Sequence, residues 1–214
     1  MASVLSGTRL QIARLLQRDG TDTVESLADK LGLAAATVRR HLDIMQRDGV
    51  VAFEELRKGT GRPCHSFRLS EAGQEALPKA YDRFLTLMLQ EIAALKKGDL
   101  AEKDGNEALS YLLRRMASSF AGTYPVPVNG PFQQRLDTLM NVMQDIGYSP
   151  DVERRDGSVF LHVRNCPFRS VAQEIEATCL FDQEFIAALI GRQATRVQCM
   201  ARGNLACCYD LGKA

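Results

Sequence analysis

The stretch LADKLGLAAATVRRHLDIMQRDGVV, residues 27–51, decides the fold of the first part of this chain. Its apolar residues follow the spacing of two short helices, and Gly32 stands between them as a stop signal. The second helix carries its apolar stripe at Val38, Leu42 and Met45. The stretch therefore predicts two helices joined by a tight turn.

A third helix precedes this pair. Ile12, Leu15 and Leu16 form its apolar stripe, and Asp19-Gly20 ends it. The helix that follows is expected to open at Asp22 or Thr23, with Glu25 placed for a capping box on Asp22.

A two-stranded ribbon is expected after the helices, with strands at 50–53 and 66–69 and a turn at 59–63. Ser70 is placed to cap a further short helix. Three helices followed by a ribbon are the parts of a winged helix-turn-helix domain. We expect this domain, with DNA as its ligand, over residues 1–77.

The last of the three helices is the one expected to enter the major groove of DNA. Arg39 and Arg40 on its outward side can reach base edges or phosphates, and the small alanines at its start can approach thymine methyl groups. Basic residues beside the glycine-rich wing tip, including Arg68, suit a phosphate or minor-groove contact. The predicted DNA-binding residues are Ala35, Ala36, Thr37, Arg39, Arg40, Arg57, Lys58 and Arg62.

Charge adds modest support. Residues 34–68 carry seven Lys or Arg against four Asp or Glu, although a charged helix face is often only solvated. The whole chain of 214 residues has 27 basic and 26 acidic residues and a net charge of +1, which excludes a histone-like polycation and a disordered acidic tail. With 45% apolar residues, the chain can form a sizeable core, and its length is ordinary for two domains.

The stretch at 27–51, together with GTGRPCHSFRLSEAG at 59–73, resembles winged-helix bacterial repressors of the ArsR and DeoR type. Those families commonly show a similar "LA…LG…TVRRHL" stretch, followed by a wing with a Gly-Arg-Pro tip. The resemblance covers about residues 8–78. It implies a transcriptional regulator whose partner is a double-stranded DNA operator.

A longer helix is expected over 78–98, because Pro78 can open it and Lys96-Lys97-Gly98 can end it. An apolar stripe follows it at helical spacing: Tyr81, Leu85, Met88, Ile92 and Leu95. Such a stripe is a core face or a seam between two copies of the chain, and we expect a homodimerisation helix here.

The polar segment 99–105 is the expected boundary before an α+β domain at 99–214. Helices are predicted near 106–121 and 131–146, then a hairpin turning at Asp156-Gly157, then helical stretches up to about Gly191. A second hairpin is predicted around Gly203-Asn204. The expected fold class is thus α+β, with a winged helix-turn-helix, a long dimerisation helix and a C-terminal sensor domain.

Cysteine is the unusual residue, since five of the six lie in the last quarter of the chain. Cys166 precedes a helical stretch, where a helix dipole favours a thiolate. A two-residue turn at Gly203-Asn204 pairs Cys199 directly with Cys208, while a bulge or an odd loop brings in Cys207 instead. The predicted metal ligands are Cys166, Cys179, Cys199 and Cys208; Cys64, in the wing, is considered incidental.

Four thiolates can hold a tetrahedral zinc ion or an iron–sulfur cluster. No close C-x2-C pair is present, and the long spacings favour a cluster or a redox switch over zinc. His162 shares a strand face with Cys166 and is a further candidate ligand, although a surface histidine is the commoner case. The cysteines can also be simply buried small hydrophobic residues.

The segments HVRNCPFRSVAQ and RGNLACCYDL, behind a winged helix, resemble the iron–sulfur-sensing repressors of the SufR type. That family shows C-x12-C-x13-C-x14-C; Cys166, Cys179 and Cys208 match it, while Gln193 stands at the third position and Cys199 lies nearby. The resemblance implies an iron–sulfur cofactor. The departure leaves open a four-cysteine site, a three-cysteine site with another ligand, or no iron.

The sequence thus predicts a homodimeric, cytoplasmic repressor whose operator affinity depends on a metal or redox state at its cysteines. A regulator controlled by a small molecule, with buried structural cysteines, is the alternative. A thiol redox enzyme is a remote third, because the sequence has no C-x-x-C, no nucleotide-binding glycine motif and no Ser/His/Asp arrangement. No signal peptide or membrane span is expected.

Overall fold

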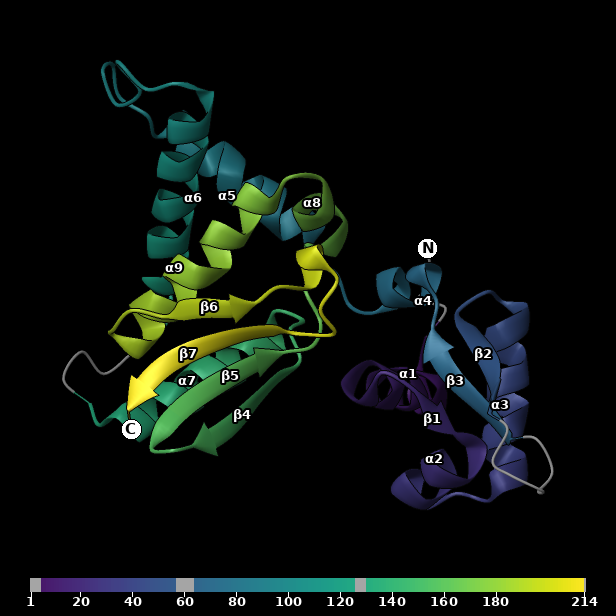
Figure 1. Cartoon of the computed structure of the whole chain (residues 1–214). Coiled ribbons are helices and arrows are strands. Elements are labelled where there is room, and N and C mark those ends of the chain that lie inside the picture. Colours follow the sequence, from purple (N-terminus) through teal and green to yellow (C-terminus); the bar gives the residue numbers. More distant parts are fainter. Residues whose placement is uncertain (1–4, 57–63, 126–129, 214) are drawn as a thin grey trace. The chain divides into compact units, whose positions relative to one another are not determined.

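The structure is a computed structural model, and it describes residues 5–56, 64–125 and 130–213. The chain divides into two compact units, Met1–Lys79 and Ala80–Ala214, and each is described by itself (Figure 1). Both combine helices with an antiparallel sheet, as an α+β fold requires. No helix among the described residues is long and apolar enough to cross a bilayer.

Unit 1 is a winged helix-turn-helix. Its elements are α1 (Gly7–Asp19), β1 (Asp22–Thr23), α2 (Val24–Leu31), α3 (Ala35–Arg47), β2 (Val51–Leu56), β3 (Cys64–Leu69) and α4 (Glu71–Ala76). The three strands form a sheet in the order β1-β3-β2, with Phe53 opposite Phe67. The expected helices and ribbon are therefore present.

The core of unit 1 lies between the three helices and the sheet. The predicted stripe of α3 is fully buried, with Val38 and Leu42 at 0% exposure. Gly32 ends α2 in the left-handed conformation, at φ 65°, and so sets the tight turn into α3. A Cβ at Gly73 would lie 2.0 Å from the Val50 carbonyl oxygen, so glycine permits the close contact of α4 with the strand.

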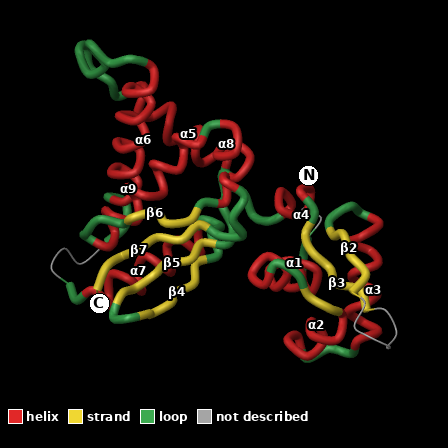
Figure 2. The backbone as a smooth tube through the Cα atoms, in the orientation of Figure 1, coloured by secondary structure: helices red, strands yellow, loops and turns green. Residues whose placement is uncertain are grey.

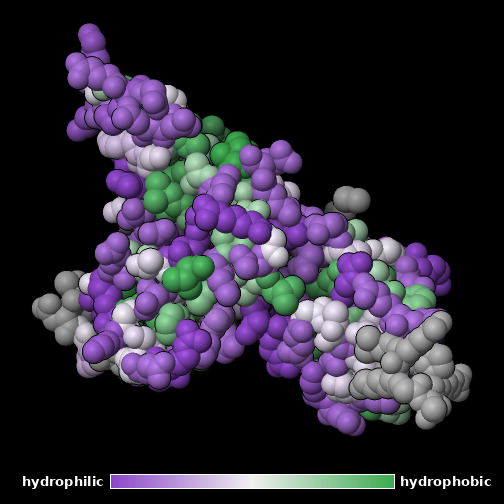
Figure 3. All heavy atoms as spheres, in the orientation of Figure 1, coloured by the Kyte–Doolittle hydropathy of each residue, from purple (hydrophilic) through white to green (hydrophobic). Residues whose placement is uncertain are grey.

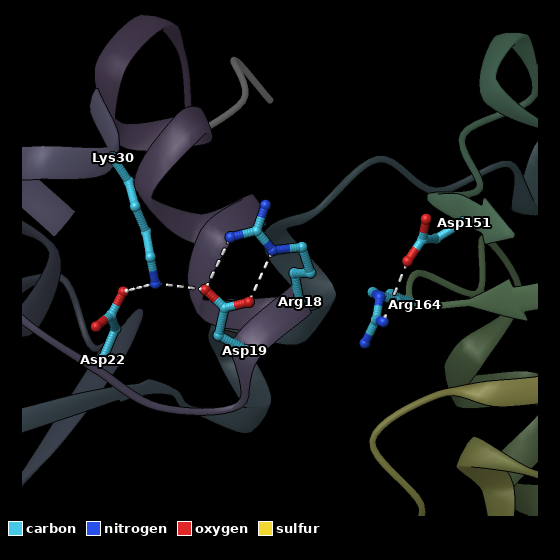
Figure 4. A network of polar contacts seen from close by, with 6 residues as sticks. All are labelled: Arg18, Asp19, Asp22, Lys30, Asp151 and Arg164. Atoms are coloured by element: carbon cyan, nitrogen blue, oxygen red, sulfur yellow. Dashed lines mark hydrogen bonds and ion pairs between the residues drawn. The ribbon is translucent and has the colours of Figure 1, made fainter. Parts of the chain in front are cut away.

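The start of α2 differs from the expected capping box. Thr23 is the N-cap, and its hydroxyl accepts the N–H of Ser26 at 3.3 Å. Asp22 is instead in β1, where its carboxylate accepts the Thr23 N–H and binds Lys30 at 2.7 Å. Lys30 also binds Asp19, which Arg18 contacts as well, so these charges join α1, β1 and α2 (Figure 4).

Unit 2 contains a four-stranded antiparallel sheet in the order β4-β5-β7-β6 (Figure 2). Its helices are α5 (Tyr81–Ala93), α6 (Gly105–Ala121), α7 (Phe132–Asp145), α8 (Arg169–Glu174) and α9 (Cys179–Ile190). Its strands are β4 (Pro150–Arg155), β5 (Ser158–Val163), β6 (Thr195–Gln198) and β7 (Cys207–Lys213), with 3-10 turns η1 (Glu176–Thr178) and η2 (Met200–Arg202). The last strand, β7, is inserted between β5 and β6.

The first hairpin of unit 2 matches its sequence signal. Asp156 and Gly157 have φ of 54° and 77°, as the central residues of a type I′ turn require. Helix α9 is buried over much of its surface, and Phe181 and Phe185 are both fully buried. Asp104 and Glu107 form a capping box at the start of α6, inside the polar segment that was expected to separate domains.

The second hairpin departs from its expected register. The pairing of β6 with β7 shifts between Arg196 and Gln198, so that Val197 is an extra residue and Gln198 lies opposite Cys208. The predicted direct pair of Cys199 and Cys208 is therefore wrong. The bulge places Cys199 in register with Cys207, and η2 replaces the two-residue turn.

The long helix expected at 78–98 is α5, and it belongs to the compact body of unit 2. Its Phe84 is buried, with ring centroids 4.7 Å from Phe168 and 5.6 Å from Phe181. The predicted stripe is divided: Tyr81 and Met88 pack against the core, while Leu85 and Ile92 are 56% and 44% exposed. Figure 3 shows hydrophobic residues on the surface of the molecule.

Candidate nucleic-acid interface and thiol cluster

The outward face of α3 is the candidate nucleic-acid interface. Ala36, Thr37, Arg39 and Arg40 are exposed, as expected from the burial of the stripe behind them. Arg39 is 61% exposed, and its only ion pair within the described residues is a long one of 3.7 Å to Glu25 on α2. A weak pair of this kind leaves the guanidinium free to move to a phosphate or a base edge.

Ala35 differs from the other predicted contacts of α3. Its side chain is half-buried and packs against the core of unit 1, so it supports the start of the helix. Arg57, Lys58 and Arg62 lie outside the described residues, and so does the side chain of Cys64. Arg68 of β3 is exposed and lies 3.5 Å from Glu54 across the ribbon.

Four buried sulfur atoms form the second candidate site, in unit 2. We call Cys166, Cys179, Cys199 and Cys207 the thiol cluster; each is at most 6% exposed and belongs to the same apolar core. They come from the loop after β5, the start of α9, the end of β6 and the start of β7. The fold therefore brings together residues that lie up to 41 positions apart.

Cys199 lies at the centre of the thiol cluster. Its Sγ is 3.9 Å from Cys179 Sγ, and its backbone N–H donates to Asn204 Oδ1 at 3.1 Å, which fixes the turn. The sulfur of Cys207 accepts the N–H of Met200 at 3.3 Å. Cys166 is buried in the same hydrophobic core.

Cys208, a predicted ligand, does not belong to the same core as the thiol cluster. Successive strand residues point to opposite faces, so Cys208 leaves the face that Cys207 shares with the core. It lies opposite His162 of β5 and interacts with Glu153. His162 itself binds Glu153 at 2.9 Å, so the histidine belongs to the other side of the sheet and not to the thiol cluster.

Burial favours the protonated thiol at Cys166, Cys179 and Cys207. It raises the pKa of Cys166 and Cys179, and the nearby Asp182 carboxylate raises both further. Burial likewise raises the pKa of Cys207 to about 12. The Phe168 N–H at the start of α8 lowers the pKa of Cys166, but by less than burial raises it, so the thiolate expected from a helix dipole is not favoured.

Polar groups that sequence reasoning missed line one side of the cluster. Asp182 is one helical turn after Cys179 and accepts a hydrogen bond from the buried Tyr148 hydroxyl. Burial raises the pKa of Asp182 to about 6. Tyr209 follows Cys207 by two strand positions, and Arg196 lies opposite Tyr209. Strand alternation in β7 could have predicted that Tyr209 shares a sheet face with Cys207. The position of Arg196 opposite Tyr209 could not be predicted, because it depends on the register shift between β6 and β7.

Cysteine sulfur is a donor type that zinc and iron–sulfur centres use. Two sulfur atoms bound to one tetrahedral zinc lie about 3.8 Å apart, from Zn–S bonds of about 2.3 Å. The 3.9 Å between Cys179 and Cys199 is close to this separation. Within the described part of the chain, no three His, Cys, Asp or Glu residues are arranged so that they could hold a metal ion. Metal binding would therefore require the sulfur atoms of Cys166 and Cys207 to move toward those of Cys179 and Cys199.

Comparisons with known proteins gave a family match and a similar solved structure. Residues 4–52 match a family described as a helix-turn-helix domain. A crystal structure of Bacillus subtilis PadR in complex with operator DNA is similar at 16% identity and a TM-score of 0.29, over 64% of this chain and 89% of that one. The comparison with curated proteins gave no match.

The family match and the fold agree on the class of unit 1. Its three helices, short turn and ribbon, with an exposed basic α3, make it a helix-turn-helix DNA-binding domain of the winged type. This domain type places the chain among DNA-binding transcriptional regulators.

Proposed function

We propose that this protein is a homodimeric transcriptional repressor whose affinity for its operator is set by a metal group at the thiol cluster. An iron–sulfur cluster is the proposed cofactor, with zinc as the simpler alternative. Cys166, Cys179, Cys199 and Cys207 would hold it. The observation that carries the proposal is the burial of these four cysteines in one core, with Cys179 in contact with Cys199, in a chain that also has a helix-turn-helix domain.

The bound group would supply charge and sulfur–metal bonds that change on oxidation or on loss of the metal. Without it, burial raises the pKa of the Cys179 thiol, and Cys179 contacts Cys199 directly. With it, the sulfur atoms of Cys166, Cys179, Cys199 and Cys207 would bind as thiolates, and their protons would be released to solvent. The chain segments that carry these residues must shift accordingly.

The segment that carries Cys166 is hydrogen-bonded to Ala80, the first residue of unit 2. The Ala80 N–H donates to the carbonyl oxygen of Pro167 at 3.2 Å, and Pro167 directly follows Cys166. Phe84 packs on Phe168 and Phe181, which lie two residues after Cys166 and Cys179. A shift of these cysteines therefore moves the start of α5, to which unit 1 is covalently joined.

The exposed stripe of α5 supports the homodimer. Leu85, Leu89 and Ile92 follow at spacings of four and three residues, and their exposed fractions are 56%, 56% and 44%. Such a row is typical of the seam between two paired helices. The occupant we propose is α5 of a second copy, because one chain carries a single α3 whereas helix-turn-helix dimers read two half-sites about one helical turn apart.

The interaction with DNA is tested on α3. We expect the double substitution Arg39→Ala and Arg40→Ala to weaken operator binding at least about 30-fold, since each base or phosphate contact contributes roughly 1–3 kcal/mol. Operator fragments selected from random DNA by the wild-type chain serve as the ligand, and fluorescence anisotropy gives the affinity. Arg114→Ala with Arg154→Ala, exposed arginines of unit 2, is the control with equal charge change. Unchanged binding by the α3 variant would show that another surface reads the DNA.

The metal is tested on anaerobically purified protein by assays for iron, acid-labile sulfide and zinc, followed by operator binding with and without the metal. We expect iron and sulfide together and a change in operator affinity of about 5–150-fold on their removal. A metal-free chain whose operator affinity responds to a small molecule would overturn the metal proposal and leave the DNA-binding function intact.

A further inference from the structure

A groove between α7 and β4 in unit 2 shares no residue with α3 or with the thiol cluster. Its volume is about 490 Å³, which lies within the range of small-molecule sites. Its lining residues on α7 run from Gln133 to Asn141 and are spaced so that they form one face of the helix. Val152 and Arg154 line it from β4, where alternate residues share a face. Two rigid elements therefore form the walls of this groove.

The floor of the groove is apolar. Leu136 is 2% exposed and belongs to the core of unit 2. Met140 and Val152 are half-buried and pack against the same core. A methionine side chain adapts its shape to the group that it contacts. The floor therefore suits a small apolar side chain of a ligand.

One acid and one base lie at the rim, and a neutral amide lies between them. Gln133 Nε2 donates to Asp137 Oδ1 at 2.7 Å, and Arg154 Nη2 donates to Gln133 Oε1 at 2.6 Å. Within the part of the chain that the structure describes, neither Asp137 nor Arg154 forms an ion pair. The second carboxylate oxygen of Asp137 and the other N–H groups of Arg154 can therefore bind a ligand while the amide stays in place.

Asp151 is the other charged residue of the groove, and its charge is already compensated. Arg164 Nη2 donates to its Oδ2 at 3.4 Å (Figure 4). The Val152 N–H donates to its Oδ1 at 3.0 Å. The groove thus presents one negative and one positive charge to a ligand, at Asp137 and at Arg154.

The short separation of these two charges points to a free α-amino acid. The single carboxamide of Gln133 connects Asp137 with Arg154. The ammonium and carboxylate groups of an α-amino acid are attached to the same carbon atom, so they are almost as close together as the two ends of a carboxamide. In a peptide these charged groups lie at opposite ends of the chain and are too far apart.

We propose that this groove binds a free α-amino acid with an apolar side chain. Its ammonium group donates to Asp137, its carboxylate accepts from Arg154, and its side chain lies on Leu136, Met140 and Val152. The inference goes beyond the proposed function and does not rest on it, because no residue of the groove belongs to the thiol cluster.

The test measures binding to the full chain by equilibrium dialysis. The probes are L-leucine, isopentylamine and 4-methylpentanoate, which share one side chain and carry both charges, the ammonium alone or the carboxylate alone. We expect L-leucine to bind at least about tenfold more tightly than either of the others, since each of these lacks one charge-assisted hydrogen bond. Glycine should also bind at least about tenfold more weakly, because it leaves the apolar floor uncovered.

Two variants assign the charges to their residues. Asp137→Asn should weaken binding of L-leucine about tenfold without weakening binding of 4-methylpentanoate, and Arg154→Gln should weaken L-leucine similarly without weakening isopentylamine. The matched controls, Asp145→Asn and Arg155→Gln, should bind L-leucine as the wild type does. Asp145 is exposed on α7 outside the groove, and Arg155 follows Arg154 on β4 and points to the opposite face. All four positions are exposed, so the melting temperature should stay within a few degrees.

Three results would overturn the proposal. It is wrong if isopentylamine or 4-methylpentanoate binds as tightly as L-leucine, because one charge of the groove would then be sufficient. It is wrong if the control variants lose as much affinity as Asp137→Asn and Arg154→Gln. It is also wrong if L-leucine does not bind at millimolar concentration. None of these results affects the proposed metal group, and the metal assays do not affect the groove.

Discussion

At the scale of single residues, Cys207 and Cys208 offer a direct comparison of two adjacent thiols. Both are 4% exposed, but only Cys207 belongs to the core that holds the thiol cluster. We expect Cys207→Ser to abolish most metal binding and Cys208→Ser to retain the wild-type content, because serine lacks the soft sulfur ligand. Iron, sulfide and zinc assays on anaerobic protein measure the difference. The reverse result would mean that the register of β6 and β7 carries no bulge.

Asp19 is the residue whose ionisation most clearly stabilises unit 1. A hydrogen bond from Arg18, then one from Lys30, lowers its pKa from 3.8 to about 2 against the opposing effect of burial. Its contribution is therefore fully present above about pH 4 and is lost as the pH falls through 2. We expect Asp19→Asn to lower the free energy of unfolding at pH 6, and the difference from wild type to vanish near pH 2.

Urea unfolding followed by a signal from unit 1 at both pH values measures this. Asp29→Asn is the control, since Asp29 is an exposed acid on α2. A difference between Asp19→Asn and wild type that is constant over this pH range would show that the ion pairs of Asp19 do not form in solution.

Single residues were also the hardest features to predict. The cap at Thr23 and the bulge at Val197 each depend on one-residue alternatives that the sequence left open. A one-residue change in register moves every side chain of a strand to the other face. For this reason three of the four predicted cysteines are in the cluster, while Cys208 lies outside it and Cys207 inside.

At the scale of elements, α5 has two apolar faces with different roles. Phe84 faces the core of unit 2, and the exposed row of Leu85, Leu89 and Ile92 is the proposed dimer seam. We expect Leu85→Lys with Leu89→Glu to convert the dimer to a monomer and to leave the melting temperature within a few degrees, since both side chains are exposed. Sedimentation velocity measures the mass.

The control for this experiment is Gln90→Lys, an exposed position on the same helix outside the row. It should leave the dimer intact. A dimer that persists in the double variant would show that α5 is not the seam.

Elements with strong local signals were predictable. The helices of unit 1 follow their apolar spacing, Ser70 caps α4 by accepting the Gly73 N–H, and Asp156-Gly157 forms its turn as expected. The apolar pattern of α5 did not tell which face meets the core, because leucines occur on both. Only the aromatic partners Phe168 and Phe181, more than 80 residues away, decide it.

At the scale of the whole molecule, the proposed signal passes from the thiol cluster to the start of α5 through Phe84. We expect Phe84→Leu to bind metal and operator but to lose most of the metal-dependent change in operator affinity, since the ring that contacts Phe168 and Phe181 is gone. Anisotropy titrations with loaded and metal-free protein measure the change. Phe185→Leu is the control, because that ring stacks on Phe181 at 6.0 Å from within α9.

Both leucine variants remove a buried aromatic ring and should lower stability by a similar amount. If Phe185→Leu loses the response and Phe84→Leu keeps it, the signal does not pass through α5.

The division of the chain into these two units was only partly visible in the sequence: the polar segment near 99–105 is a surface turn, while the division at Lys79 follows from the packing of α5.

The place of β7 in its sheet has a consequence for synthesis on the ribosome. Because β7 lies between β5 and β6, both earlier strands must wait for Cys207–Lys213 before they can join one sheet. The helices and ribbon of unit 1 emerge much sooner, with their own core already complete in sequence. A chain stopped before Cys207 would thus present a finished DNA-binding domain joined to a divided sheet, and we expect such a product to occupy operators without responding to metal until proteases remove it.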